Sequence, residues 1–314
     1  MPSEQGLDFL VFVHVHYPEI WEEMRRELAA KIATPFGLVA TYRRGLAAPA
    51  LPDTPYLRFS RMIEVENRGR DILPFMKALR ADLPKVDIGL KIHTKRSPHR
   101  IDGADWRAFM CGSLLSSNDD GLTALRLLSQ EKRVALIAPE GHLLSLKGRL
   151  GLNRRAMNKM AKILTGEPLP LDVESYRFSA GSMFWFRPSA LAPFANKALE
   201  HQFPAERGQL DGTAAHAAER LFALVVERQG LIAAGMEAVD PILTRLEGGG
   251  TVATPEIRHL VETRSQATGN PFIVPLADLW RRHRGLFFLA QLAYVYLPRP
   301  VTRLLRTLVR YFLT

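Results

Sequence analysis

Short apolar runs alternate with amphipathic stretches along most of this 314-residue chain. The continuous apolar run at 9–13 is typical of a strand buried on both faces. We expect further strands at 37–41, 60–66, 88–93 and 134–138, of which 88–93 ends in polar residues. Apolar residues recur at helical spacing between them, at 19–32, at 71–83 and, as two helices, within 104–130. This alternation predicts an α/β fold with a mostly parallel sheet flanked by helices, which binds ligands beyond the carboxyl ends of its strands.

The second half of the chain continues the pattern less regularly. We expect a helix at 154–164, a strand at 178–186, a helix at 213–229 and a last strand or turn at 235–243. Three consecutive glycines, 248–250, then indicate a hinge. The sequence therefore predicts an α/β domain over 1–247 and a C-terminal extension over 248–314.

Composition indicates an ordinary folded protein, with 47% apolar and 24% charged residues. The one cysteine, Cys111, excludes an internal disulfide and suits a reducing compartment. The first residues lack the basic segment and the cleavage site of a signal peptide. We therefore expect a cytoplasmic protein.

Positive charge is concentrated at the C-terminal end of the chain. The net charge is +10, and residues 279–314 hold seven arginines and no acidic residue, which leaves +3 for the rest. The arginines at 303, 306 and 310 recur at helical spacing opposite apolar residues, whereas the apolar run 286–297 is too short to span a bilayer. We expect basic amphipathic helices on an anionic membrane, at the inner face of the cytoplasmic membrane, although packing on the domain is an alternative. The nearly neutral body does not indicate nucleic-acid binding.

Two polar clusters follow the first and third predicted strands. His14 and His16 share one face at the end of the first strand; they can recognise a ligand, hold a metal, or be ordinary core or edge histidines. After the third strand, the segment Asn67, Arg68, Gly69, Arg70 and Asp71 opens a helix. Gly69 allows a tight turn, the arginines suit phosphate oxygens, and Asp71 can cap the helix. The segment predicts an anion site, with a capped turn and solvated arginines as the alternative.

A third cluster ends the fourth predicted strand. Lys91, His93 and Lys95 alternate onto one face while the strand lasts. Three such groups can hold a pyrophosphate as charges and hydrogen-bond donors. The alternative is a solvated basic edge.

Two further segments combine small, aromatic and acidic residues. Gly181 and Ser182 allow a ligand close to the backbone, Trp185 can stack on a sugar, and Arg187 is a further candidate. Near the predicted helix at 213–229, the candidates are Glu206, Asp211, His216 and Glu219. A carboxylate here can act as general base on a hydroxyl, and a helix cap with a surface ion pair is the alternative.

Five of these segments, in this order, resemble the rhamnan synthesis protein F family: HVHY, ENRGRDILPF, KIHTKRS, GSMFWFR and LDGTAAHAAERLF. They run from His14 to Phe222, about two thirds of the chain. The resemblance implies a GT-A-like (nucleotide-diphosphosugar transferase) fold. It also implies transfer of a sugar, commonly rhamnose from dTDP-rhamnose, onto a growing lipid-linked glycan of lipopolysaccharide, capsule or rhamnan.

The resemblance also implies roles for the candidate residues. Many GT-A enzymes hold a divalent cation with Asp-x-Asp where this chain has His93-Thr94-Lys95. We therefore expect catalysis without a metal, with Mg²⁺ and Mn²⁺ left open. The expected donor and pyrophosphate ligands are His14, His16, Asn67, Arg68, Gly69, Arg70, Asp71, Lys91, His93 and Lys95. The expected sugar and acceptor ligands are Gly181, Ser182, Trp185, Arg187, His216 and Glu219, and the base of an inverting transfer is Asp211 or, as second choice, Glu206.

Two other functions remain open from the sequence. One is a metal-dependent hydrolase that uses His14 and His16, for which His93 is one further ligand but no complete set is evident. The other is a catalytically silent subunit of glycan assembly that keeps the fold.

Overall fold

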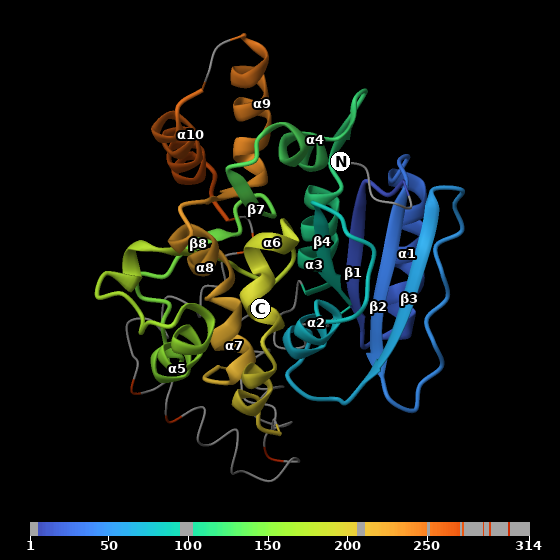
Figure 1. Cartoon of the computed structure of the whole chain (residues 1–314), viewed down its shortest axis with the longest axis horizontal. Helices are drawn as coiled ribbons and strands as arrows, with labels where there is room; N and C mark the ends of the chain where they lie inside the picture. The colour runs from blue at the N-terminus through green and yellow to red at the C-terminus, as the bar shows by residue number, and fades with distance from the viewer. Residues whose placement is uncertain are drawn as a thin grey trace.

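The computed structural model describes residues 6–94, 103–205, 211–249 and 252–270 and the single positions 272, 285, 289 and 301. A seven-stranded sheet in the order β11-β7-β10-β4-β1-β2-β3 forms its centre (Figure 1). These strands are β1 (Phe9–Val15), β2 (Phe36–Arg43), β3 (Leu57–Val65), β4 (Gly89–His93), β7 (Val134–Ala138), β10 (Phe184–Phe186) and β11 (Ile232–Gly235). Two small antiparallel sheets pair β5 (Ser117–Asn118) with β6 (Gly121–Leu122) and β8 (Leu143–Ser145) with β9 (Arg177–Ser179).

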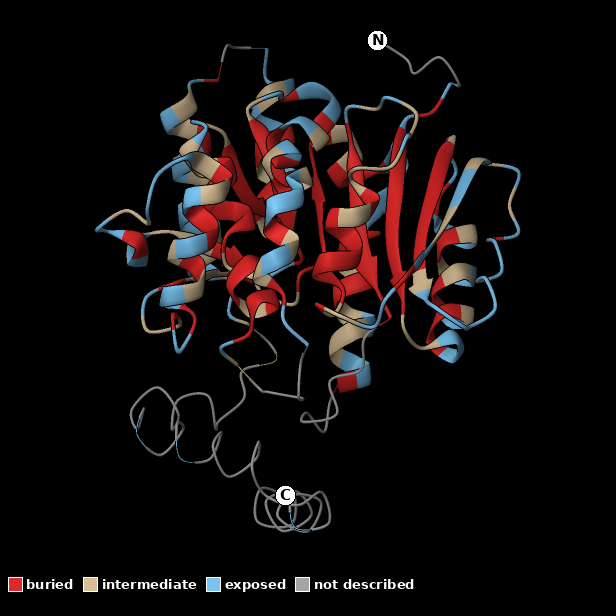
Figure 2. Ribbon diagram, turned by 60° about the horizontal axis from the view of Figure 1, so that its bottom comes forward, coloured by how far each residue is buried: buried red, intermediate tan, exposed pale blue. Residues whose placement is uncertain are grey.

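Helices cover the central sheet, and most of its strands are buried (Figure 2). The edge strand β3 is the exception, because most of its residues are exposed or partly exposed. They are α1 (Pro18–Lys31), α2 (Ile72–Ala78), α3 (Gly103–Leu114), α4 (Thr123–Gln130), α5 (Arg154–Thr165), α6 (Pro188–Leu191), α7 (Ala214–Glu219), α8 (Phe222–Arg228), α9 (Val239–Glu247) and α10 (Thr254–Ala267). Short 3₁₀ turns occur at Val173–Ser175, Ala192–Ala195, Lys197–Gln202 and Met236–Ala238. The predicted α/β class, with a mostly parallel sheet flanked by helices, is therefore confirmed.

The topology of the sheet has a switch point between β1 and β4. The chain adds β2 and β3 on one side of β1, then returns to place β4 on the other side, in parallel. His14 of β1 and His93 of β4 are register partners at the carboxyl ends of these strands. Loops that leave a switch point in opposite directions form a crevice, and ligands of open α/β sheets bind there.

Strand β10 runs antiparallel to both of its neighbours, β4 and β7. The sequence predicts one strand over 178–186, but the structure has β9, a turn and β10 in two different sheets. Gly181 and Ser182 both have positive φ, which turns the chain between the two strands. The residues at the break are small and are buried or partly buried, so no charged or strongly polar residue marks it in the sequence.

The region after residue 213 also differs from the expectation. The single helix expected at 213–229 is two helices, α7 and α8, and the apolar pattern runs through because both bury their faces. The expected strand or turn at 235–243 is wrong, because β11 ends at Gly235 and α9 follows. Pro241 lies in the first turn of α9, where its missing N–H has no helical partner to lose.

Beyond the glycine segment, α10 packs against α9 and β11. The guanidinium of Arg133 anchors its start by donating to Val252 O at 2.8 Å and to Thr254 Oγ1 at 3.0 Å. Among the described residues, no helix is long and apolar enough to cross a bilayer. The predicted membrane-binding segment 279–314 lies outside the described residues except for positions 285, 289 and 301.

The partly buried carboxyl of Glu227 makes the stability of this region depend on pH. Burial raises the pKa of Glu227, in α8, to about 7, although Arg177 and Arg258 oppose the shift. Because the unfolded carboxyl has a pKa of 4.5, the folded state binds more protons between pH 4.5 and 7. The protonated Glu227 therefore stabilises the folded state below this window, and this stabilisation is lost as the pH rises through the window.

We expect Glu227→Gln to stabilise the protein at pH 8 by up to about 3 kcal/mol, because it removes the buried charge. At pH 4.5 we expect almost no difference from the wild type, since both carboxyl and amide are then neutral. Urea unfolding at the two pH values measures this. Glu167→Gln, the same change at an exposed residue, controls for net charge; equal effects of Glu227→Gln at both pH values would contradict the prediction.

Candidate functional site

The candidate site lies at the carboxyl-end edge of the sheet, at the switch point. His14, at the end of β1, is buried, and its Nδ1 lies 3.0 Å from Thr41 Oγ1 in β2. Thr41 donates its own proton to Val13 O, at 3.3 Å. The hydroxyl therefore accepts from His14 Nδ1–H, which leaves a lone pair on Nε2.

Burial is the main reason that His14 is neutral. Burial, with smaller contributions from the neighbouring His16, His93 and Lys91, lowers the pKa of His14 to about 3, while Asp71 opposes the shift. Burial and Arg43 also lower the pKa of the half-buried His16. Both histidines are therefore uncharged rings at neutral pH.

Thr94 connects the end of β4 to the start of α1. Its hydroxyl accepts from the backbone N–H groups of His16 and Tyr17, at 2.8 and 3.0 Å. Its own N–H donates to His14 O at 3.0 Å. These bonds satisfy N–H groups at the beginning of the helix and fix the turn that carries His16.

A buried ion pair lies under the site. Lys91 Nζ donates to Asp71 Oδ2 at 2.8 Å, to Ser182 O at 2.5 Å and to Ser182 Oγ at 2.8 Å. Lys91 and Asp71 are 1% and 3% exposed, so both charges are removed from bulk water. Lys91 thus connects the start of α2 to the turn before β10. An ammonium has three N–H groups, and the three acceptors above match that number.

This geometry changes the expected roles of both residues. Asp71 stands at the N-cap of α2 as predicted, but its side chain makes no cap hydrogen bond and pairs with Lys91 instead. A direct grip of Lys91 on pyrophosphate does not fit its burial and its acceptors. We assign Lys91 instead to positioning Asp71 and Ser182.

The turn before β10 is held from two sides. His93 Nε2 lies 2.8 Å from Gly181 O, and since a carbonyl only accepts, that nitrogen carries a proton. On the other side, Glu219 of α7 accepts from Gly181 N at 2.7 Å. Ser182 has a φ of 57°, a strained conformation for a residue with a side chain, which the surrounding bonds maintain.

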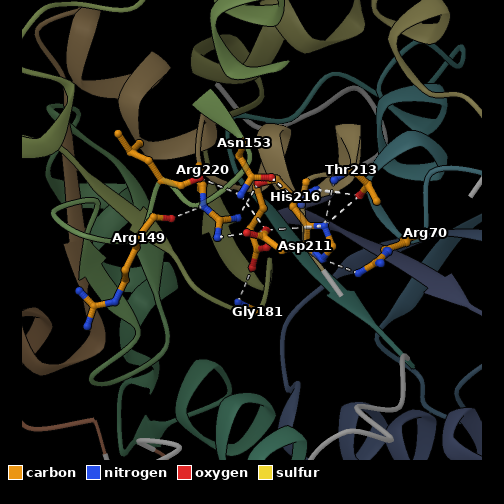
Figure 3. A network of polar contacts seen from close by, with 11 residues as sticks. Arg70, Arg149, Asn153, Gly181, Asp211, Thr213, His216 and Arg220 are labelled. Atoms are coloured by element: carbon orange, nitrogen blue, oxygen red, sulfur yellow. Dashed lines mark hydrogen bonds and ion pairs between the residues drawn. The ribbon is translucent and has the colours of Figure 1, made fainter. Parts of the chain in front are cut away.

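A second left-handed turn, Gly69–Arg70, follows β3, with φ values of 70° and 55°. A Cβ at Gly69 would collide with Leu73 and Phe203, so the close packing requires glycine. Arg70 Nη1 donates to His216 Nε2 at 2.7 Å (Figure 3). A guanidinium can only donate, so Nε2 of His216 accepts from Arg70.

Asp211 lies in the same network (Figure 3). Its Oδ1 accepts from Asn153 Nδ2 at 2.7 Å and lies 3.6 Å from Arg220 Nη2 and 3.9 Å from His216 Nδ1. Asn153 is fully buried and also accepts from Gly212 N at 3.2 Å, so it orients the loop that carries Asp211. The amide of Asn153 and the guanidinium of Arg220 thus fix the carboxylate of Asp211 shortly before the first turn of α7.

Some expected site residues lie elsewhere. Trp185 is fully buried and its indole N–H donates to Leu114 O at 2.8 Å, so the ring offers no face to a sugar. Arg187 is buried as well and donates to the carbonyls of Val134 and Glu131. Both predictions are wrong because β10 and the residue that follows it are buried in the core.

The remaining candidates are divided between the rim and the part of the chain that is not described. Arg68 lies at the rim, with Nη1 3.3 Å from Phe203 O and Nε 3.4 Å from Glu66 Oε2. Asn67 beside it is exposed. Lys95 and Glu206 lie outside the described residues.

Thr41 and Asn153 are site residues that the sequence analysis missed. Asn153 stands directly before α5 and reads as an ordinary helix start, whereas its bond to Asp211 crosses 58 residues. Among the described residues, no group of three or more His, Cys, Asp or Glu side chains could hold a metal ion.

Comparison with known proteins identifies the family of this chain. The sequence matches the family of rhamnan synthesis protein F (RgpF) over residues 3–231. Over 236 residues it is 35% identical to the uncharacterized protein WxcX of two strains of Xanthomonas campestris pv. campestris. That match covers 70% of this chain and 31% of WxcX, so the chain spans about a third of the length of these relatives. The chain belongs to the rhamnan synthesis protein F family.

Proposed function

We propose that this chain is a glycosyltransferase domain that transfers a sugar from a nucleotide-diphosphosugar to a growing cell-surface polysaccharide. Membership of the RgpF family indicates involvement in polysaccharide synthesis. The observation that carries the proposal is the convergence of five sequence segments at one switch-point edge, where open α/β folds bind ligands. Rhamnose from dTDP-rhamnose is our first candidate for the donor, because the family is named for rhamnan synthesis.

Arginine side chains are the proposed contacts of the diphosphate. Arg68 and Arg70 follow β3 at the rim of the site, and Lys95 follows β4 in the sequence. Guanidinium groups match phosphate oxygens in geometry and charge. The proposed transfer therefore stabilises the departing diphosphate with fixed cations, in a GT-A-like fold and without a metal.

Asp211 is the proposed general base. Asn153 and Arg220 fix its carboxylate, and His216 lies next to it. A fixed carboxylate can take the proton of an acceptor hydroxyl as the oxygen attacks the anomeric carbon from the face opposite the diphosphate. The C–O bond to the diphosphate breaks as the new glycosidic bond forms, which inverts the configuration.

The acceptor and the place of the reaction are parts of the same proposal. A lipid-linked glycan at the inner face of the cytoplasmic membrane would meet the enzyme through the basic segment 279–314. Flotation with anionic liposomes, with and without this segment, tests it. Equal flotation of both forms would leave the membrane part of the proposal without support.

Calorimetric titration with dTDP-rhamnose in EDTA, and then with Mn²⁺ or Mg²⁺, tests the donor site. We expect binding in EDTA and at least a tenfold weaker affinity for Arg70→Met, because one charged contact to phosphate is lost. Arg58→Met, at an exposed position of β3, is the matched control. Absence of binding to a panel of nucleotide sugars in all conditions would overturn the proposal, and binding without turnover would favour a silent assembly subunit.

A further inference from the structure

Trp106, in α3, lies beside the turn of Gly181 and Ser182 at the edge of the candidate site. A Cβ at Gly181 would lie 3.2 Å from Trp106 Cζ2 and 2.7 Å from Met110 Sδ, so the indole closely approaches this backbone. Trp106 is partly exposed, whereas the described tryptophans Trp21 and Trp185 are 1% and 0% exposed. Among the described tryptophans, Trp106 therefore combines exposure with a place at the site.

A hydrogen-bond chain fixes the orientation of this indole. Trp106 Nε1 donates to His142 Nε2 at 2.7 Å, and an indole nitrogen can only donate. The other nitrogen of His142 lies 2.7 Å from Glu140 O, so the ring is neutral with its proton on Nδ1. His142 is fully buried, and a buried histidine with both nitrogens bonded is a rigid anchor for the tryptophan.

A carboxylate is also bonded to the turn that the indole approaches, and sugars need polar partners of this kind for their hydroxyl groups. Glu219 holds Gly181 N with Oε1, and its Oε2 makes no hydrogen bond with the described residues. The Gly181–Ser182 turn is already fixed from below by His93 and Lys91. An oriented aromatic face next to a fixed turn and a carboxylate is suited to a ring with one apolar face and hydroxyl groups at its rim.

We propose that the indole of Trp106 is a wall of the sugar-binding subsite, against which a hexose ring packs while Glu219 binds its hydroxyls. This inference rests on the proposed function and names the residue that distinguishes a nucleotide sugar from its nucleotide. His142 is a positioning residue that acts through Trp106. The sugar can come from the donor or from the acceptor glycan, and the chemistry of the contact is the same.

Titration calorimetry of the full chain with dTDP, dTDP-rhamnose and a rhamnose oligosaccharide separates these sources. For Trp106→Ala we expect dTDP affinity within about twofold of the wild type, and at least a tenfold loss for one of the two sugar ligands. Loss for dTDP-rhamnose assigns the subsite to the donor, and loss for the oligosaccharide assigns it to the acceptor. Trp106→Phe keeps a ring without the bond to His142 and is expected to lose less.

The design distinguishes the failure of this inference from that of the proposed function. Retained dTDP binding and a thermal unfolding temperature close to the wild type show that a variant is folded. If wild-type protein binds dTDP-rhamnose and Trp106→Ala binds both sugar ligands equally well, the role of Trp106 is refuted while the proposed function stands. If the wild type binds none of the three ligands, the proposed function itself fails.

Discussion

Replacement of Lys91 by methionine is expected to destabilise the folded protein by about 3–5 kcal/mol. Methionine fills a similar volume, but Asp71, which is 3% exposed, would be left as a buried carboxylate without its ammonium partner. The carbonyl and hydroxyl oxygens of Ser182 would lose their donor as well. Urea unfolding, followed by circular dichroism, measures the change.

The chain provides a matched control for this substitution. Lys132 and Asp87 form an ion pair at 3.4 Å, with both side chains 66% exposed. Lys132→Met is expected to change the free energy of unfolding by less than about 1 kcal/mol, because solvent screens exposed pairs. The double variant Lys91→Met/Asp71→Asn is expected to recover part of the loss, since it removes the unpaired charge. A change below about 1 kcal/mol for Lys91→Met would contradict the assigned role.

The second large effect is expected on turnover. Asp211→Asn is expected to reduce sugar transfer by about 10²–10⁴-fold, the range of general base catalysis, with donor affinity nearly unchanged. Asparagine keeps the shape of the side chain and its acceptor for Asn153 Nδ2, so the loop that Asn153 orients is expected to keep its conformation. Single-turnover transfer from dTDP-rhamnose to a glycan acceptor, beside calorimetric donor binding, separates chemistry from binding.

Asp240→Asn is the corresponding control, because it makes the same change at an exposed position of α9. It is expected to retain wild-type turnover. Near-normal turnover of Asp211→Asn would show that another group takes the proton, and Glu206 is then the next residue to substitute. A variant that loses donor binding together with turnover would indicate that Asp211 organises the site rather than acting as the base.

Most of the sheet was predictable from the sequence because its strands other than the edge strand β3 are largely buried. The expected strand at 134–138 matches β7, and the run 88–93 predicts β4 to within one residue. Buried parallel strands leave continuous apolar runs, which few other elements of this length produce. The positions of His14 and His93 at strand ends followed from the same runs.

The contacts of the site were not predictable, because they join segments far apart in the chain. Lys91 and Ser182 are 91 residues apart, and Arg70 and His216 are 146 apart. Sequence patterns report periodicity within an element, but they do not state which loops meet across an edge. For the same reason the sequence did not indicate Trp106, whose place at the site depends on His142 and Gly181.

The reversed direction of β10 has a consequence for how this domain can be altered. Because β10 opposes its neighbours, the segment before Phe184 opens at the same edge as the segments after β4 and β7. A change in the turn before Phe184 would therefore alter the candidate site itself, because Lys91 and His93 hold that turn. The segment after Phe186 lies at the opposite edge and begins with the buried Arg187, which donates to core carbonyls. An exchange of segments between homologues should accordingly treat the two ends of this three-residue strand differently, because one end borders the candidate site and the other belongs to the core.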